Sequence, residues 1–112
     1  MCPHRKISSF KAYHIYRAKH PLRKATYPRP WIFVGKYGDR YDCFPIVTEI
    51  LHDDEQYFEV SDNHKDFSVT GLNHTLFILH DHVWPLALDA FVKHLGKLPD
   101  DVLEAFKQEI GH

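Results

Sequence analysis

The chain is 112 residues long, which is enough for one hydrophobic core and predicts a single domain over residues 1–112. Its composition, 44% hydrophobic and 26% charged, is typical of a folded globular protein. The uncharged stretch from 67 to 80 is too short and too polar for a membrane span, so no association with a membrane is expected.

Positive charge is concentrated near the N-terminus. Residues 1–40 contain ten of the 14 lysines and arginines and a single acid, Asp39, so this segment carries +9 and the remaining 72 residues carry −10. A segregated basic segment is typical of a face that binds a polyanion. The charges alone are equally compatible with two halves that neutralise each other within the fold.

The cysteines and the N-terminus predict a cytoplasmic protein. Cys2 and Cys43 have no spacing typical of metal binding or redox chemistry, which predicts free thiols. Residues 1–10 are basic but lack the apolar core of a secretory signal.

Short segments of strand-forming residues follow one another along the chain. Residues 10–17 are predicted to form a strand with an exposed basic face, and 18–29 a basic loop with two prolines. A second strand is predicted at 30–34, where proline takes the first position, which a strand tolerates. After a turn at 36–39, residues 43–50 predict a third strand.

The second half continues this pattern. Residues 52–55 and 61–64 predict turns on either side of a strand at 57–60, and a further strand is predicted at 75–79. Residues 85–95 fit either a short helix or a turn that leads into a strand.

The last element has a helical pattern. Pro99 suits the first turn of a helix, and Val102, Leu103, Phe106 and Ile110 recur on one helical face.

Together these elements predict an α+β, mainly β domain built on a small barrel. It comprises a basic N-terminal strand and loop over 1–29, a barrel core over 30–98 and a C-terminal amphipathic helix over 99–111.

Two positions in this pattern have the chemistry of a phosphate site. Arg29 lies between Pro28 and Pro30, which restrict the backbone around it, so its guanidinium is suited to a fixed, bidentate phosphate contact. Thr48 brings a hydroxyl to the end of the predicted third strand. Taken alone, each residue also fits an ordinary surface arginine or a strand threonine.

The order of these motifs resembles the MazF/PemK family, which are toxin endoribonucleases of type II toxin–antitoxin systems. The resemblance covers roughly residues 28–111. It rests on Arg29-Pro30 before a strand, Pro45-Ile46-Val47-Thr48 at the end of the next strand, Gly71-Leu72 before a further strand, and Leu95-Gly96-Lys97-Leu98 before the terminal helix.

The resemblance implies an SH3-like barrel of the CcdB/PemK type, a homodimer, and cleavage of single-stranded RNA by a hydrolase without a metal or cofactor. The ribose 2′-hydroxyl would attack the neighbouring phosphate, and an antitoxin protein would neutralise the activity. Arg29 would stabilise the charged transition state and Thr48 would position the scissile phosphate. The resemblance does not supply the residue for proton transfer, and we expect His20 to take this role, because histidine titrates near neutral pH.

The loop before Arg29 departs from the family pattern. It lacks the glutamate of the family and carries positive charge instead, which favours RNA binding. The residues expected to bind RNA are Lys19, Arg23, Lys24, Tyr27, Lys36 and Tyr37.

Two alternatives remain open. A non-catalytic relative would bind RNA, or a protein target as CcdB does, through the basic N-terminal face. A metal site at His80 and His82 would need a further ligand, and none has a convincing spacing. A polar corner after the 75–79 strand is therefore the preferred interpretation, and no metal is expected.

Overall fold

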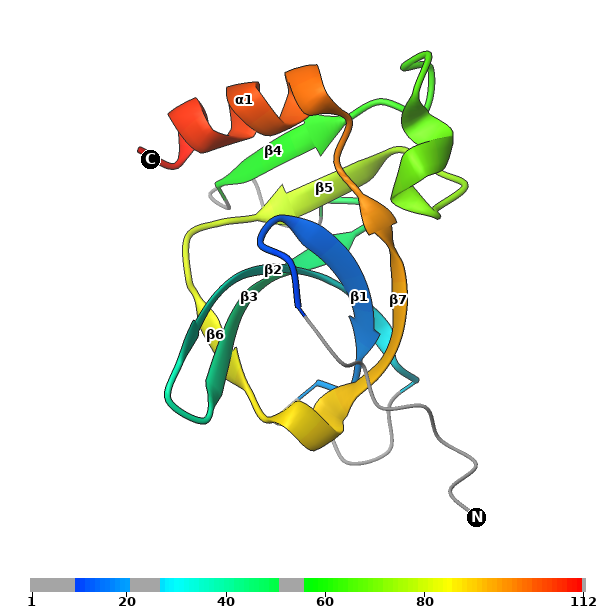
Figure 1. Ribbon diagram of the computed structural model, residues 1–112. Coiled ribbons are helices and arrows are strands. Elements are labelled where there is room, and N and C mark those ends of the chain that lie inside the picture. The colour runs from blue at the N-terminus through cyan, green and yellow to red at the C-terminus, as the bar shows by residue number, and fades with distance from the viewer. Residues whose placement is uncertain (1–9, 21–26, 51–55, 112) are drawn as a thin grey trace.

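A computed structural model describes residues 10–20, 27–50 and 56–111 of the chain. Within these residues, antiparallel strands form a sheet in the order β4-β5-β3-β2-β1-β7, with β6 paired to β3. Figure 1 shows the helix α1 lying across one end of this curved sheet. The prediction of a mainly β fold with a C-terminal helix is confirmed. The strands are β1 (His14–Ala18), β2 (Arg29–Tyr37), β3 (Arg40–Val47), β4 (Tyr57–Val60), β5 (Leu76–Leu79), β6 (Trp84–Leu86) and β7 (Phe91–Lys97), and the helices are η1 (Phe67–Thr70), η2 (Leu88–Ala90) and α1 (Asp100–Glu109).

Strand β3 pairs with three other strands. Residues from Arg40 to Pro45 pair with β2, Tyr41–Cys43 also pair with β6, and the last two residues of β3 pair with β5. The last pair between β2 and β3 joins Trp31 to Pro45. Beyond it, β2 runs beside β1 and β3 runs beside β5, and we refer to this point as the β2–β3 fork.

Side chains of β1, β2 and β3 alternate between two hydrophobic clusters, as the period of a strand requires. One cluster, the helix-side core, lies toward α1, and the other, the aromatic core, lies toward β6. The helix-side core contains Ile15, Ile32, Phe44, Ile46, Val60, Phe67, Leu76, Ile78, Leu98 and Phe106. The aromatic core contains Tyr16, Ala18, Trp31, Phe33, Tyr41, Cys43 and Leu86.

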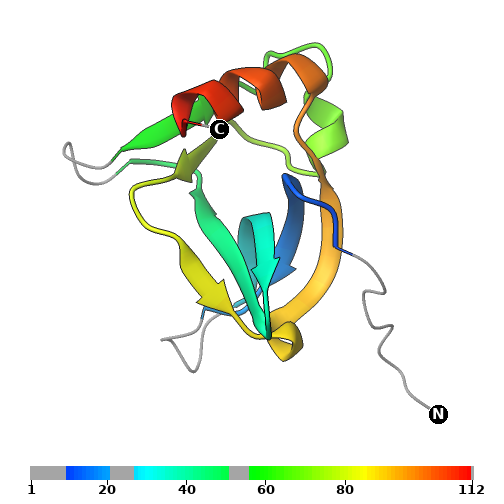
Figure 2. The same ribbon diagram turned by 60° about the vertical axis from the view of Figure 1, so that its left-hand side comes forward.

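Helix α1 is docked through a single fully buried side chain, Phe106. Its ring packs against the rings of Phe44 and Phe58, at 6.1 and 5.3 Å between centroids. Asp100 and Asp101 lie in the first turn, where negative charge is favourable, and Gly111 with φ 83° follows the last turn. Figure 2 shows from a second side that α1 covers β4.

Several element boundaries differ from those expected. The first strand begins at His14 and not at residue 10, because Tyr13 has a φ of 66° and closes a turn in which the His14 N–H donates to the Lys11 carbonyl. Strand β2 extends to Tyr37, so the turn is confined to Gly38 and Asp39.

The later elements match their predicted bounds to different degrees. Strand β3 ends at Val47, three residues earlier than expected, whereas β4 at Tyr57–Val60 matches its prediction. The ambiguous stretch 85–95 contains most of β6, the short helix η2 and the start of β7. The turn predicted at 52–55 lies outside the described residues. Among the described residues, no helix has the length and apolar character needed to cross a membrane.

The backbones of η1 and β7 lie in direct contact. A Cβ atom on Gly96 would overlap the carbonyl oxygens of Val69 and Thr70, and one on Gly71 would overlap the carbonyl of Leu95. Glycine at these two positions therefore allows the two segments to touch through their backbones.

We predict that Gly96→Ala lowers the free energy of unfolding by about 2–3 kcal/mol, because the new methyl group meets backbone that no rotamer change can move. Gly38→Ala is the control: Gly38 has a φ of 62° and open space around it, so only the left-handed backbone is penalised, by about 1 kcal/mol. Denaturant unfolding measures both. An equal cost at the two positions would contradict the contact.

Candidate functional site

Arg29 is the first residue of β2 and is exposed at this end of the strand. It is paired with Ala18, the last residue of β1. Pro28 and Pro30 on either side are partly buried, so the backbone that carries the guanidinium is both restricted by the prolines and fixed by packing.

Three other predicted residues lie at the same end of the β1–β2 pair. Lys19 follows β1, is exposed, and its backbone N–H donates to the Ala90 carbonyl at 2.9 Å. Tyr27 is 87% exposed just before β2. His20 is partly buried. Its ring packs against the two tryptophans Trp31 and Trp84, at 5.7 and 5.1 Å between centroids.

Thr48 lies on the other side of the β2–β3 fork. It directly follows β3 and is exposed. Arg29 precedes the last β2–β3 pair by two residues and Thr48 follows it by three, so both lie at the same end of this strand pair. The two predicted catalytic residues therefore flank the fork, from different strands.

Two basic residues that the sequence analysis did not select lie on β1 and β7, toward the end of the β1–β2 pair that carries Arg29. Arg17 on β1 and Lys93 on β7 are exposed, directly opposed in the sheet, and therefore on the same face, whereas Arg29 pairs with Ala18 and lies on the other face. We refer to Arg17, Lys19, Arg29 and Lys93 as the basic rim. Among the described residues, the ion pairs within 4.0 Å include none of these four.

Sequence reasoning missed Lys93 because it falls in the ambiguous stretch 85–95, and its partnership with Arg17 depends on a register between strands that are far apart in the chain. For Arg17 a signal was present, since the residue alternates with apolar neighbours in the predicted first strand.

Lys36 and Tyr37 lie at the opposite end of β2 from Arg29. Seven residues separate Lys36 from Arg29, which corresponds to roughly 23 Å along the strand. The structure therefore does not bring these two predicted RNA-binding residues into the basic rim. Arg23 and Lys24, the other two, lie outside the described residues.

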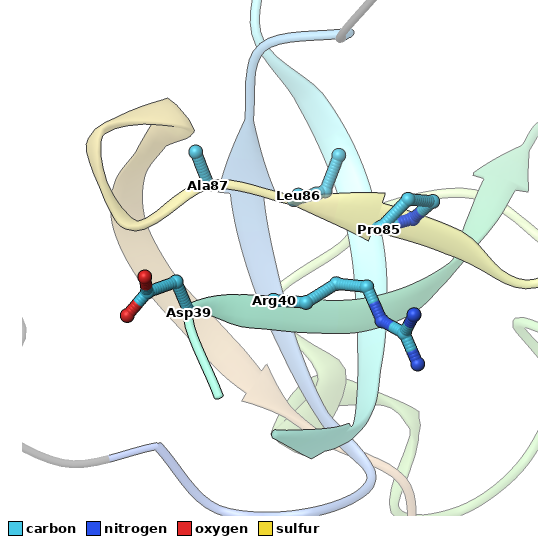
Figure 3. A pocket seen from close by; sticks show the side chains of 5 residues that line it. All are labelled: Asp39, Arg40, Pro85, Leu86 and Ala87. Carbon is cyan, nitrogen blue, oxygen red and sulfur yellow. The ribbon is translucent and has the colours of Figure 1, made fainter. Parts of the chain in front are cut away.

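A surface pocket of about 320 Å³ lies near Lys36 and Tyr37, lined by Asp39, Arg40, Pro85, Leu86 and Ala87. Figure 3 shows Asp39 and Arg40 on one side and the β6 segment on the other, with the Arg40 guanidinium directed away from the Asp39 carboxylate.

The charge of Arg40 is compensated within the fold. Its Nε lies 2.9 Å from Oδ1 of the buried Asp42, and its guanidinium lies 5.6 Å from the centre of the Tyr37 ring. An arginine already paired with a carboxylate offers less to a phosphate than one without such a partner. The basic rim is therefore the stronger candidate for binding a polyanion.

His80 and His82 do not share a strand face. His80 follows β5 and packs against Phe106 of α1, with Nε2 3.7 Å from a Glu109 carboxylate oxygen, whereas His82 lies in an exposed bend. Among the described residues, no three His, Cys, Asp or Glu side chains are grouped so that they could hold a metal ion.

Cys43 has the environment of a structural thiol. It is fully buried in the aromatic core, and this burial, followed by the nearby Asp42 carboxylate, raises the pKa of the thiol strongly. A thiol that stays protonated is a poor nucleophile, so Cys43 does not add covalent chemistry to the site.

Comparison with known proteins shows the fold but no relative in sequence. No protein-family model matches the chain, and no curated protein matches it. Among solved structures, the Mycobacterium tuberculosis toxin MazF-mt6 superposes with a TM-score of 0.65 at 17% identity, over 88% of this chain and 92% of that one. The chain thus has a MazF-like toxin fold, as the order of its motifs predicted.

Proposed function

We propose that this chain is a toxin-type endoribonuclease that cleaves single-stranded RNA without a metal or other cofactor and is neutralised by an antitoxin protein. The observation that carries the proposal is the position of Arg29, exposed on a proline-restricted backbone at the β2–β3 fork, with Thr48 on the other side. The fold shared with a MazF toxin supports it.

The reaction requires two proton transfers and stabilisation of a crowded phosphate. The ribose 2′-oxygen attacks phosphorus and loses its proton, and the bond from phosphorus to the 5′-oxygen breaks as that oxygen gains a proton. The products are a 2′,3′-cyclic phosphate and a 5′-hydroxyl. Negative charge develops on the non-bridging oxygens, and the Arg29 guanidinium supplies two parallel donors to them.

Thr48 and His20 complete the proposed machinery. The Thr48 hydroxyl donates to a non-bridging oxygen and fixes the scissile phosphate relative to Arg29. His20 lies at the same end of the β1–β2 pair as Arg29, with its ring held against Trp31 and Trp84, and we assign it the proton transfers.

The basic rim extends the proposed site beyond the reacting phosphate. Arg17, Lys19 and Lys93 would neutralise neighbouring phosphates of the RNA, and the exposed ring of Tyr27 offers a face on which a base can stack.

We also propose a homodimer in the cytoplasm. Val83, Leu88 and Val92 near β6 and β7 expose apolar side chains that such an interface would cover. Light scattering of the purified protein is expected to give twice the mass of the chain, and the mass of a single chain would contradict this part of the proposal.

We predict that the protein cleaves single-stranded RNA in the presence of EDTA, and that Arg29→Lys and Thr48→Ala each reduce the rate by about 100-fold or more. Lysine keeps the charge but loses the planar pair of donors. Mass spectrometry of the products is expected to show cyclic phosphate and 5′-hydroxyl ends.

Two matched variants control this experiment. Arg40→Lys keeps a cation beside Asp42 on β3, far from Arg29, and is expected to leave the rate unchanged. Thr48→Ser keeps the hydroxyl and is expected to retain most of the rate. RNA binding without scission by the wild type would favour the non-catalytic alternative and overturn the proposed reaction.

The basic rim also predicts a change in salt dependence. For a non-cleavable 2′-deoxy oligonucleotide, the double variant Arg17→Met, Lys93→Met should reduce the slope of log affinity against log salt by about 1.4, because each phosphate contact to a single strand contributes about 0.7. Lys65→Met, an exposed lysine in the turn before η1, is the control and should leave the slope unchanged. Equal slopes for all three proteins would show that the rim does not contact the nucleic acid.

A further inference from the structure

Two histidines from strands far apart in the chain form a hydrogen-bonded pair. Nδ1 of His14, at the start of β1, lies 2.9 Å from Nε2 of His94 on the neighbouring β7. His14 lies four residues from Ala18, the partner of Arg29, which is roughly 13 Å along β1. The pair is therefore separate from the candidate site at the fork.

The geometry of the pair is that of an end-on hydrogen bond. The ring centroids are 5.1 Å apart and the ring planes are inclined by 22°. The centroid separation exceeds the nitrogen separation by about the width of one imidazole ring, so the two nitrogens lie close to the line between the ring centres. One ring donates and the other accepts, and a second proton between them would place two N–H groups face to face.

Lysines surround the pair. The turn closed by the left-handed Tyr13 brings Lys11 beside His14, and the Lys11 backbone N–H donates to the Tyr16 hydroxyl oxygen at 3.0 Å. Lys97 on β7 is the residue paired with His14 in the sheet.

Other charged or titratable groups face the pair from the elements around it. The Tyr16 ring lies 5.0 Å from the His94 ring, whereas Lys93, which pairs with Arg17, lies on the other face of β7. Among the described residues, the acid within 4.0 Å of these lysines is Asp100 of α1, which is largely exposed and whose Oδ1 lies 4.0 Å from Nζ of Lys97.

These surroundings disfavour positive charge on His14. Burial lowers the pKa of His14, and His94, Lys11 and Lys97 lower it further. An anion placed among these groups would pair with both lysines and make protonation of His14 favourable. A divalent cation would instead be repelled by the lysines.

We propose that His14, His94, Lys11 and Lys97 form a second phosphate-binding site, in which binding is coupled to uptake of a proton by His14. The phosphate accepts hydrogen bonds from the lysine ammonium groups and from the imidazole N–H groups. It is either a backbone phosphate of a nucleic acid or a free phosphate. The site does not depend on the cleavage reaction proposed for Arg29 and Thr48.

The test is a titration of the full-length protein with inorganic phosphate, monitored through the histidine ring signals in NMR spectra at pH 6 and pH 8, with chloride holding the ionic strength constant. The expected result is a shift of the His14 and His94 signals that saturates, and a ratio of the affinity at pH 6 to that at pH 8 that is about tenfold larger in the wild type than in His14→Asn, because phosphate loses a proton of its own in this range. Signals that do not move at either pH, or the same ratio in both proteins, would overturn the proposal.

Variants identify the groups involved. Lys97→Met removes one cation and keeps the apolar stem, and His14→Asn keeps hydrogen bonding without a titrating proton. The first should weaken binding about tenfold, and the second should leave only the pH dependence that comes from phosphate itself. His74→Asn, at an exposed histidine before β5, is the matched control and should bind as the wild type does. Wild-type behaviour of both Lys97→Met and His14→Asn would refute the site.

A second titration separates the two sources of phosphate. A 2′-deoxy oligonucleotide that shifts the same ring signals identifies a backbone phosphate as the ligand, whereas signals that respond only to inorganic phosphate identify a free anion. Because neither titration involves strand scission, the result is independent of the outcome of the cleavage assay.

Discussion

The pairing of β3 with three other strands is the constraint on which the rest of this structure depends. On one side β3 pairs with β2, and on the other side it pairs first with β6 and then with β5. Its ladder with β2 ends at Trp31 and Pro45, which is the β2–β3 fork. Arg29 and Thr48 lie on either side of this point, each at the end of a strand. The residues next to them in the chain are held in place by packing. Precise placement of such side chains is what stabilisation of a phosphate requires.

Charge compensation distinguishes the cationic surfaces of the molecule. Arg40 is as exposed to solvent as a binding residue would be, but the buried Asp42 holds it in an ion pair. The basic rim has no comparable carboxylate among the ion pairs of the described residues. The lysines around the histidine pair are similarly exposed, with Asp100 as a solvent-exposed neighbour. Exposed ion pairs are weak, so these two surfaces keep most of their attraction for anions.

The fork and the histidine pair lie at different positions along β1, with the aromatic core between them. Tyr16 belongs to that core and also contacts the histidine pair and its neighbour. Its ring lies against the His94 ring, and its hydroxyl oxygen accepts from the Lys11 backbone N–H. A rigid apolar layer thus fixes the spacing between the two candidate phosphate contacts. A single strand of nucleic acid that occupied both would meet them at a set separation, which is a basis for selectivity by length and path.

Local chemistry determined much of what was predicted from the sequence. The proline pair around Arg29 restricts the backbone wherever the segment lies, and the apolar period of residues 102–110 needs a single surface to bury Phe106. The strand at 57–60 and the terminal helix were predicted from such local patterns. The order of the motifs along the chain predicted the MazF-like fold. Tertiary structure decided the rest. The pairing of Arg17 with Lys93 and of His14 with His94 depends on the register of β1 against β7, and the neutralisation of Arg40 depends on the burial of Asp42. These are contacts between segments brought together by folding, or effects of burial, and residue patterns along one strand carry no information about either.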